Sequence, residues 1–255
     1  MPSRWKIWAW RLLLIAVLLV AWQIASEQSP LMKFLFGAPI AIANRLWIWW
    51  SSGTIYRHLG ITLVETLLSF AIGCGLALVM GLWLALNHML GAVLDPFIKA
   101  ANSMPRLILA PIFAVWFGLG IWSKVALGVT LVFFVVFFNV YQGIKDVSPV
   151  LLANARMLGA SRRQLIERVY IPSALTWVFS SLHVSVGMAF VGAVIGEYLG
   201  SAAGVGYLIL QAEGTFDIDT VLAGIIMLTM FALILDSVIT VVEDALLVWR
   251  PKPQN

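Results

Sequence analysis

Six long stretches that are almost free of charged residues constrain this chain more than any other feature of its sequence. A helix needs about 20 predominantly apolar residues to cross the hydrocarbon core of a bilayer. The runs are continuous, whereas a membrane β-barrel would show alternating apolar and polar residues. We therefore expect an all-α membrane protein with six transmembrane helices, at about residues 7–25, 62–87, 106–122, 124–145, 173–196 and 220–243.

The composition excludes several other classes of protein. Of the 255 residues, 62% are apolar and 11% are charged, whereas a soluble domain has about 45–50% apolar and about 25% charged residues. A single soluble core cannot hide so much apolar surface, which argues against a cytosolic α/β enzyme. The only cysteine, Cys74, cannot form an intrachain disulfide, which argues against a secreted disulfide-rich scaffold.

Basic residues set the expected orientation, because Lys and Arg concentrate on the cytoplasmic side of a membrane protein. With six spans, both termini are predicted to be cytoplasmic. The opposite side includes the segment 197–219, which has four acidic residues and no Lys or Arg. The cytoplasmic segments then hold 12 of the 16 basic residues: Arg4, Lys6, Arg11, Lys99, Arg106, Lys145, Arg156, Arg162, Arg163, Arg168, Arg250 and Lys252.

Two segments near the first span admit alternatives. The basic N-terminus also fits the head of a signal peptide, but no clear small-residue cleavage site follows, so we interpret residues 7–25 as a retained helix. Residues 39–50 are apolar almost all round, and we expect them to form a short helix at the outer interface. The alternative for that segment is a seventh span, against which its short length argues.

Residues 146–171 form the most basic and least apolar part of the chain, yet they carry helix signals. Ser148-Pro149 is typical of a helix start, and Gly159 suits the left-handed residue that ends a helix. Ser161 and Gln164 predict a capping box that opens a second helix, which we expect to stop before Pro172. We call residues 146–171 the connecting module and interpret it as a docking surface for a cytoplasmic partner.

Two other interpretations of the connecting module explain less of its sequence. A helix-turn-helix with several arginines suggests DNA binding. That interpretation is disfavoured because both flanks enter the bilayer within a few residues, which leaves no third helix and no freedom to enter a groove. An ordinary basic loop explains the charge but not the capping pattern.

The connecting module resembles the cytoplasmic signature of the permeases of binding-protein-dependent ABC importers. That signature is Glu-Ala-Ala, three residues, Gly, nine residues, Ile, one residue and Leu-Pro. Gly159 falls in the glycine position, Val169 in the isoleucine position, and Ile171-Pro172 in the Leu-Pro position. The sequence departs from the pattern at Ala153, which stands where the family has Glu.

Other stretches resemble the nitrate/sulfonate/taurine-type branch of these permeases, and the likeness covers most of residues 55–250. It is most specific between Asn139 and Gly206. The stretches are His58 with Thr62-Leu63, Asp95-Pro96, Pro105, Pro111, Trp116-Phe117-Gly118, residues 133–139, and Glu197 with Gly204-Val205-Gly206.

The resemblance implies the permease subunit of a type I ABC importer in a bacterial inner membrane. Two permease copies would pair as a homodimer, two ATPase subunits would bind below, and a periplasmic or lipid-anchored binding protein would deliver the solute. The helix before Gly159 would be the coupling helix between the fourth and fifth spans. The coupling residues would be Val150, Leu151, Ala153, Asn154, Ala155, Arg156, Met157, Leu158, Gly159, Ala160 and Ser161.

The chain has no phosphate-binding Gly-x-x-x-x-Gly-Lys-Ser/Thr motif. ATP and magnesium are therefore expected on a partner ATPase. We expect this chain to carry no cofactor, to bind no nucleic acid and to catalyse no reaction. No His, Cys, Asp and Glu cluster has metal-ligand spacing, and no nucleophile–base set is visible.

Candidate residues for the solute pathway and its outer gate are His183, Gly187, Glu197, Gly204 and Gly206. The fifth span and the outer turn after it are implicated by the resemblance. Each residue has a simpler alternative. His183 also fits a hydrogen bond between helices, and Gly204 and Gly206 also fit a flexible turn.

Ionisable residues inside spans are costly and point to function or to pairing. We expect Asp236 to be paired within the bundle, and Glu65 either to pair or to reach the interface. Small residues four apart, Ala77 with Gly81 and Gly192 with Gly196, predict close helix packing.

A secondary transporter without an ATPase partner, or another polytopic membrane protein, is the alternative function. It would predict inverted repeats, and no convincing repeat is present. A membrane-embedded enzyme would need a converging catalytic set. The sequence does not identify the solute, because the resembling branch handles small anions, sulfonates and vitamin-like or pyrimidine compounds.

Overall fold

The computed structural model describes residues 4–246, and within that range all regular structure is helical. Arg250 and Lys252, which bear on the expected orientation, lie outside the described residues. The helices are α1 (Arg4–Glu27), α2 (Pro30–Phe36), α3 (Pro39–Ser52), α4 (Thr54–Leu86), α5 (His88–Asn102), α6 (Ala110–Phe117), α7 (Ile121–Lys145), α8 (Pro149–Met157), α9 (Arg162–Leu165), α10 (Ile171–Ser180), α11 (Leu182–Gly200), α12 (Val205–Gly214) and α13 (Ile218–Leu246).

Five segments in the described part of the chain are long and apolar enough to cross a membrane: Trp5–Glu27, Thr54–Leu86, Ile121–Lys145, His183–Gly214 and Ile218–Glu243. Two bent helix pairs raise the number to as many as seven. One pair is α2 with α3, bent by 48°, and the other is Met89–Asn102 with Arg106–Phe117, bent by 82°. An all-helical membrane protein is therefore confirmed, with five to seven candidate spans.

The region expected to form the third span differs from a single helix over residues 106–122. A 3₁₀ turn at Arg106–Leu109 leads into α6, which ends at Phe117, and α7 begins only at Ile121. Pro105 lacks the N–H that would continue α5, and Gly118 adopts a left-handed φ of 75°. The apolar run hides this break, because glycine and proline change the backbone without adding charge.

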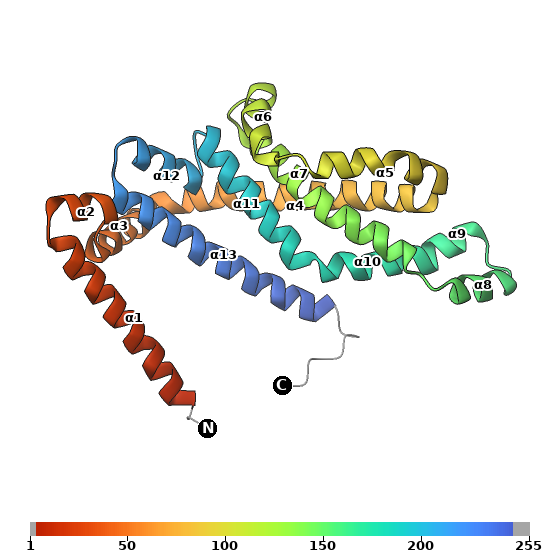
Figure 1. The fold of residues 1–255 in the computed structure, drawn as a ribbon, viewed down its shortest axis with the longest axis horizontal. Helices are drawn as coiled ribbons and strands as arrows, with labels where there is room; N and C mark the ends of the chain where they lie inside the picture. Colours follow the sequence, from red (N-terminus) through yellow and green to blue (C-terminus); the bar gives the residue numbers. More distant parts are fainter. Residues whose placement is uncertain (1–3, 247–255) are drawn as a thin grey trace.

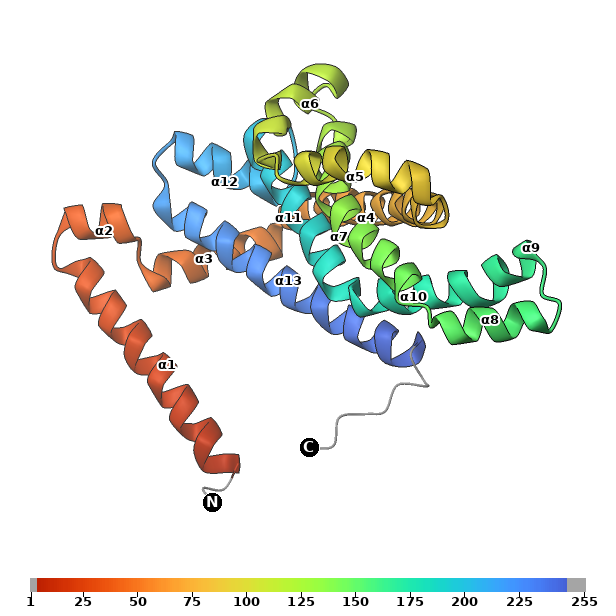
Figure 2. The ribbon, with the colours of Figure 1, turned by 45° about the vertical axis from the view of Figure 1, so that its right-hand side comes forward.

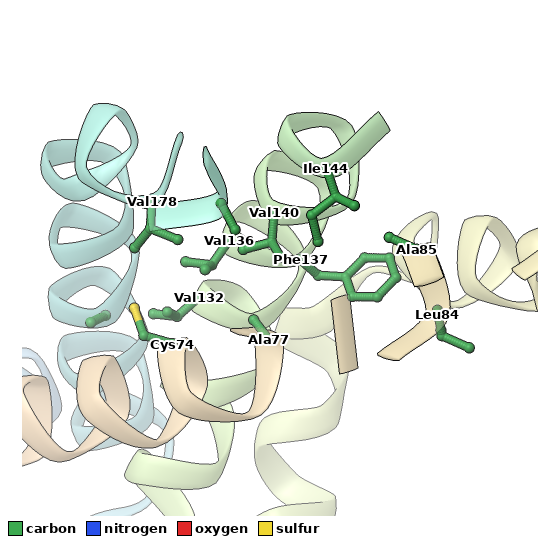
Figure 3. Packing of buried hydrophobic residues seen from close by; sticks show 12 residues of the cluster. Cys74, Ala77, Leu84, Ala85, Val132, Val136, Phe137, Val140, Ile144 and Val178 are labelled. Atoms are coloured by element: carbon green, nitrogen blue, oxygen red, sulfur yellow. The ribbon is translucent and has the colours of Figure 1, made fainter. Parts of the chain in front are cut away.

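The core lies where α4, α7 and α11 pack together. Figure 3 shows Val132 of α7 beside Cys74 of α4, and Val136 and Val140 of α7 belong to the same buried cluster. The helices approach closely because small residues face branched ones. A Cβ on Gly81 would lie 2.8 Å from a Val140 methyl carbon, so the expected close packing at Ala77 and Gly81 is confirmed.

The two ends of the molecule are built from different segments. Figures 1 and 2 show α2, α3 and α12 gathered at one end and α8 with α9 projecting from the other. Helix α1 leaves the first end and diverges from the bundle, and its apolar side chains are exposed. The connecting module therefore stands apart from the packed core.

Candidate functional site

The turn of the connecting module has the geometry that its sequence predicts. Gly159 adopts a φ of 82°, the left-handed conformation that ends a helix. The Ser161 hydroxyl accepts a hydrogen bond of 3.3 Å from the Gln164 N–H, and the Gln164 side chain accepts one of 2.7 Å from the Ser161 N–H. This capping box is therefore confirmed. Ser148 precedes α8, but its side chain makes no capping hydrogen bond.

The expectation that the second helix stops before Pro172 is wrong. Helix α9 continues through a π-helical turn, Ile166–Tyr170, directly into α10. The Ile171 N–H donates to the Ile166 carbonyl five residues back. This wider turn accommodates the Pro172 ring, which in a regular α-helix would clash with the carbonyl four residues earlier. The end of the connecting module is thus continuous with α10.

The expected coupling residues form an exposed tip, and several of its exposed side chains are apolar. Met157 and Leu158 are 79% and 88% exposed, and Val150 and Leu151 are also exposed. Helix α8 buries none of its own residues. Exposed apolar side chains on a polar, projecting element mark an interaction surface. Ala153, Asn154, Ala155, Arg156, Ala160 and Ser161 belong to the same helix and turn.

A second site lies at the opposite end of the molecule, around the fully buried carboxylate of Glu197. One of its oxygens accepts a hydrogen bond of 2.6 Å from the Thr62 hydroxyl. The other accepts a hydrogen bond of 2.8 Å from the Gly206 N–H at the start of α12. The Thr62 hydroxyl oxygen also accepts a hydrogen bond of 3.3 Å from the Val205 N–H. An anion at a helix N-terminus is favourable because unpaired N–H groups point toward it.

The turn before α12 is fixed by a further contact. His58 Nδ1 lies 3.1 Å from both the N–H and the carbonyl of Gly204. Gly204 has a φ of 106°, and a Cβ there would collide with the Glu197 carboxyl group. Glu197, Gly204 and Gly206 are therefore brought together, and the turn is held rather than flexible. We call these residues, with His58 and Thr62, the outer clamp.

Two more buried charged residues border the outer clamp. Glu65 is 1% exposed and lies one helical turn beyond Thr62 on α4, so it does not reach the surface. Lys124 is 0% exposed, and its ammonium donates to the carbonyls of Leu119 and Gly120. These carbonyls supply hydrogen bonds to the buried ammonium, because a charge without partners in a low-dielectric interior is costly.

His183 and Gly187 occupy a separate place, a groove between α11 and α13. His183 Nδ1 lies 2.9 Å from a Glu243 oxygen, and its Nε2 lies 3.2 Å from the Thr240 hydroxyl. Asp236 is 3.7 Å from the same imidazole, but its side chain is 64% exposed. The expected pairing of Asp236 is thus a loose ion pair at a surface of the single chain, while His183 does bridge two helices.

The sequence interpretation missed His58, Thr62 and Lys124 as parts of one cluster. In the predicted topology, Lys124 is only one of the four basic residues that lie outside the cytoplasmic segments. A signal was present, since Lys124 stands between two uncharged apolar runs just after Gly118 and Gly120. Within the described residues, no group of three or more His, Cys, Asp and Glu side chains is placed to hold a metal ion.

A family model and several known proteins are similar to this chain in sequence. Residues 73–248 match the family model described as "Binding-protein-dependent transport system inner membrane component". The chain is 32% identical to the putative aliphatic sulfonates transport permease protein SsuC of Bacillus subtilis (strain 168), over 95% of this chain and 88% of that protein. It is 34% identical to the formylaminopyrimidine transport permease protein ThiX of Halalkalibacterium halodurans, over 94% of this chain and 95% of that protein.

A solved structure is also similar in fold. A chain of the MetNI methionine ABC transporter in an inward-facing conformation matches with a TM-score of 0.65 and 19% identity. The match covers 78% of this chain and 95% of that chain.

Proposed function

This chain belongs to the family of binding-protein-dependent transport system inner membrane components, and we propose that it forms half of a solute pathway and transmits ATP-driven motion through α8. It is the permease subunit of an ABC importer, a multi-pass protein of the inner membrane. The subunit is not catalytic, and ATP is bound by a partner chain. A secondary transporter is therefore set aside.

The proposed topology has six spans with both termini cytoplasmic. Helices α1, α4, α7 and α13 would each form one span, α10 with α11 would form another, and the bent pair of α5 and α6 would form the third. The position of the segments supports this topology, because α2, α3 and α12 lie at one end and α8 with α9 at the other. Helix α3 would lie at the outer interface. The whole chain would be one transmembrane domain.

The proposed coupling helix is α8. The single observation that carries this proposal is the exposed apolar tip at Met157 and Leu158, held out by the left-handed turn at Gly159. A partner ATPase in each half of a homodimer would cover that tip. The π-helical turn after α9 supports the proposal, since it joins the tip to α10 and α11 without a flexible loop.

The proposed cycle uses two states of the bundle. Closure of the ATPase pair would displace both α8 helices, and α10 with α11 would carry this displacement toward the outer clamp. Binding protein docked outside and ATP bound inside would thus bias one bistable assembly from two ends. Membership of the family implies an ATPase and a binding protein as partners. Two ATPase subunits and a second permease copy are part of the proposal.

Co-purification tests the coupling proposal. We expect Leu158→Asp to abolish retention of the ATPase when both are co-expressed and the permease is captured in detergent, because a charge would replace an apolar contact. Leu31→Asp is the matched control: Leu31 is also an exposed leucine, but it belongs to α2 at the opposite end of the molecule. Equal ATPase retention by wild type and Leu158→Asp would refute the role of α8.

A further inference from the structure

Two glutamates from different helices meet inside the bundle beside the outer clamp. Glu65 of α4 is 1% exposed and Glu197 of α11 is 0% exposed. Their carboxyl groups are hydrogen-bonded to each other. An ionised carboxylate only accepts hydrogen bonds, so two ionised glutamates cannot make this contact. One hydrogen therefore lies between the two carboxyl groups.

The other contacts of Glu197 favour its ionised form. One of its oxygens accepts a hydrogen bond from the Thr62 hydroxyl, and the other accepts one from the Gly206 N–H. Gly206 lies in the first turn of α12, where the helix dipole favours a negative charge. Glu197 thus has donors on both oxygens, as a buried carboxylate requires.

The contacts of Glu65 favour its neutral form. Its Oε2 atom is buried and has no hydrogen-bond partner among the described residues. An ionised carboxyl group spreads its charge over both oxygens, so an unpartnered buried oxygen would be costly. In the neutral acid, Oε2 is the carbonyl oxygen, and the hydroxyl on the other oxygen donates to Glu197. A protonated Glu65 therefore accounts for both of its oxygens.

The balance of charge around the pair agrees with this assignment. Lys124 of α7 is the cation that faces the two glutamates, and it is 0% exposed. Its ammonium donates to two backbone carbonyls, and within residues 4–246 it forms no ion pair of 4 Å or less with either glutamate. One buried ammonium balances one buried carboxylate, so a second ionised glutamate would leave an excess negative charge in the interior. The other titratable side chain of the outer clamp, His58, is held by Gly204.

We propose that Glu65 is a positioning residue of the outer clamp that stays protonated and holds α4 to α11 by donating its hydrogen to Glu197. Loss of this proton would leave two adjacent buried carboxylates that repel each other. The outer clamp is then closed while Glu65 keeps its proton and is loosened at alkaline pH. The proposal concerns the closed outer clamp and is independent of the role of α8 in coupling.

Infrared spectroscopy of the full chain tests the protonation state directly. A protonated carboxyl group has a carbonyl stretching band above the amide I band, and an ionised carboxylate lacks it. Spectra are recorded at neutral pH in dodecyl maltoside, which contributes no ester carbonyl. We expect this band to disappear in Glu65→Gln. Glu27→Gln, which removes an exposed carboxylate of α1, is the control and should leave the band unchanged.

Glu197→Gln tests which of the two glutamates carries the hydrogen. The glutamine keeps an oxygen that can accept from Glu65, so the band should persist at a shifted frequency. Disappearance of the band in Glu197→Gln would place the proton on Glu197 and overturn the proposal, as would a band unchanged in Glu65→Gln.

Thermal unfolding at neutral and alkaline pH tests the consequence for the outer clamp. Glu65→Gln keeps a neutral hydrogen-bond donor, so it should melt close to wild type at neutral pH. Glu65→Leu fills the space without a donor and should melt at a lower temperature than Glu65→Gln. A raised pH should lower the melting temperature of wild type more than that of Glu65→Gln, because only wild type can lose the proton. The lysines and tyrosines that also titrate are common to both proteins.

Two results of the unfolding series would overturn the proposal. Equal alkaline losses in wild type and Glu65→Gln would show that no proton on Glu65 supports the fold. Equal melting temperatures for Glu65→Leu and Glu65→Gln at neutral pH would show that the contact with Glu197 holds nothing in place. ATPase retention, measured separately by co-purification, reports on the proposed function and does not affect either result.

Discussion

Glu197 of α11 accepts a hydrogen bond of 2.6 Å from the Thr62 hydroxyl of α4, although 135 residues separate them. The same carboxylate accepts a hydrogen bond from the Gly206 N–H, so a single side chain joins α4, α11 and the start of α12. The outer end of the bundle is therefore held together by polar contacts between buried groups. Such contacts are stabilising when complete and costly when one partner is lost.

Thr62→Val should destabilise the protein, because it removes the hydroxyl and leaves the buried Glu197 oxygen without its donor. We expect a loss of about 1–3 kcal/mol in the free energy of unfolding. Thr62→Ser keeps the hydroxyl and should lose less. Thermal unfolding of both variants in nanodiscs, followed by tryptophan fluorescence, checks this, and equal melting temperatures for the two would contradict it.

Gly204→Ala should be more damaging than a glycine replacement elsewhere. The φ of 106° is strained for any residue with a Cβ, at a cost of about 1–3 kcal/mol, and the new methyl group would collide with the Glu197 carboxyl. Gly214→Ala is the control, since a Cβ there meets no atom within 4 Å. Expression yield and melting temperature measure the difference; similar values for the two variants would count against a rigid outer clamp.

Gly192→Leu should separate α7 from α11. A Cβ at Gly192 would lie 3.0 Å from the Gly128 backbone nitrogen, which cannot move aside as a side chain can. Overpacking of this kind costs about 1–3 kcal/mol. Gly60→Leu provides the control, because Gly60 faces open space on α4. The melting temperature should fall only for Gly192→Leu, and the reverse order would show that this helix contact is not tight.

The stability of the α12–α13 connection should depend on pH through Asp217. Burial raises the pKa of Asp217, but hydrogen bonds from the Thr220 hydroxyl and N–H, with Arg45 nearby, outweigh this effect and lower its pKa overall. A carboxyl group whose pKa is lowered by folding contributes stability above its unfolded pKa and loses it as pH falls through the folded value.

Asp217→Asn should therefore reduce stability at neutral pH and leave less difference from wild type in acid. Asp217 and Arg45 form a partly exposed ion pair of 2.9 Å, so we expect a change of only about 0.2–1 kcal/mol from that pair. Urea or thermal unfolding at several acidic and neutral pH values measures it. A difference between the two proteins that grows toward low pH would contradict the assigned sign.

Ser161→Ala should loosen the start of α9 without unfolding the bundle. It removes the oxygen that accepts from the Gln164 N–H, a change worth about 0.5–2 kcal/mol at a helix start. Ser161→Thr keeps an acceptor and should behave more like wild type. Hydrogen exchange of the amides of residues 162–165 should be faster in Ser161→Ala, and unchanged exchange would contradict the role of the capping box.

Local signals predicted part of this structure well. The turn at Gly159 and the capping box at Ser161 each depend on neighbouring residues, so the sequence identified both. The continuation of the helix past Pro172 was not foreseen, because a π-helical turn absorbs the proline and leaves no compositional trace. The break near Gly118 was also hidden within an apolar run.

The sequence by itself determined that this chain is a helical membrane protein with a structured basic module, because hydrophobic length and helix-ending residues act within a few turns of the chain. Only the tertiary structure decided that Glu197 meets Thr62 and His58 lies beside Gly204, and that Lys124 is fully buried. It likewise left Asp236 exposed and placed it beside His183. These pairings arise where α4, α7, α11 and α13 pack, and helix packing joins residues far apart in the chain whose local sequence carries no record of the partner.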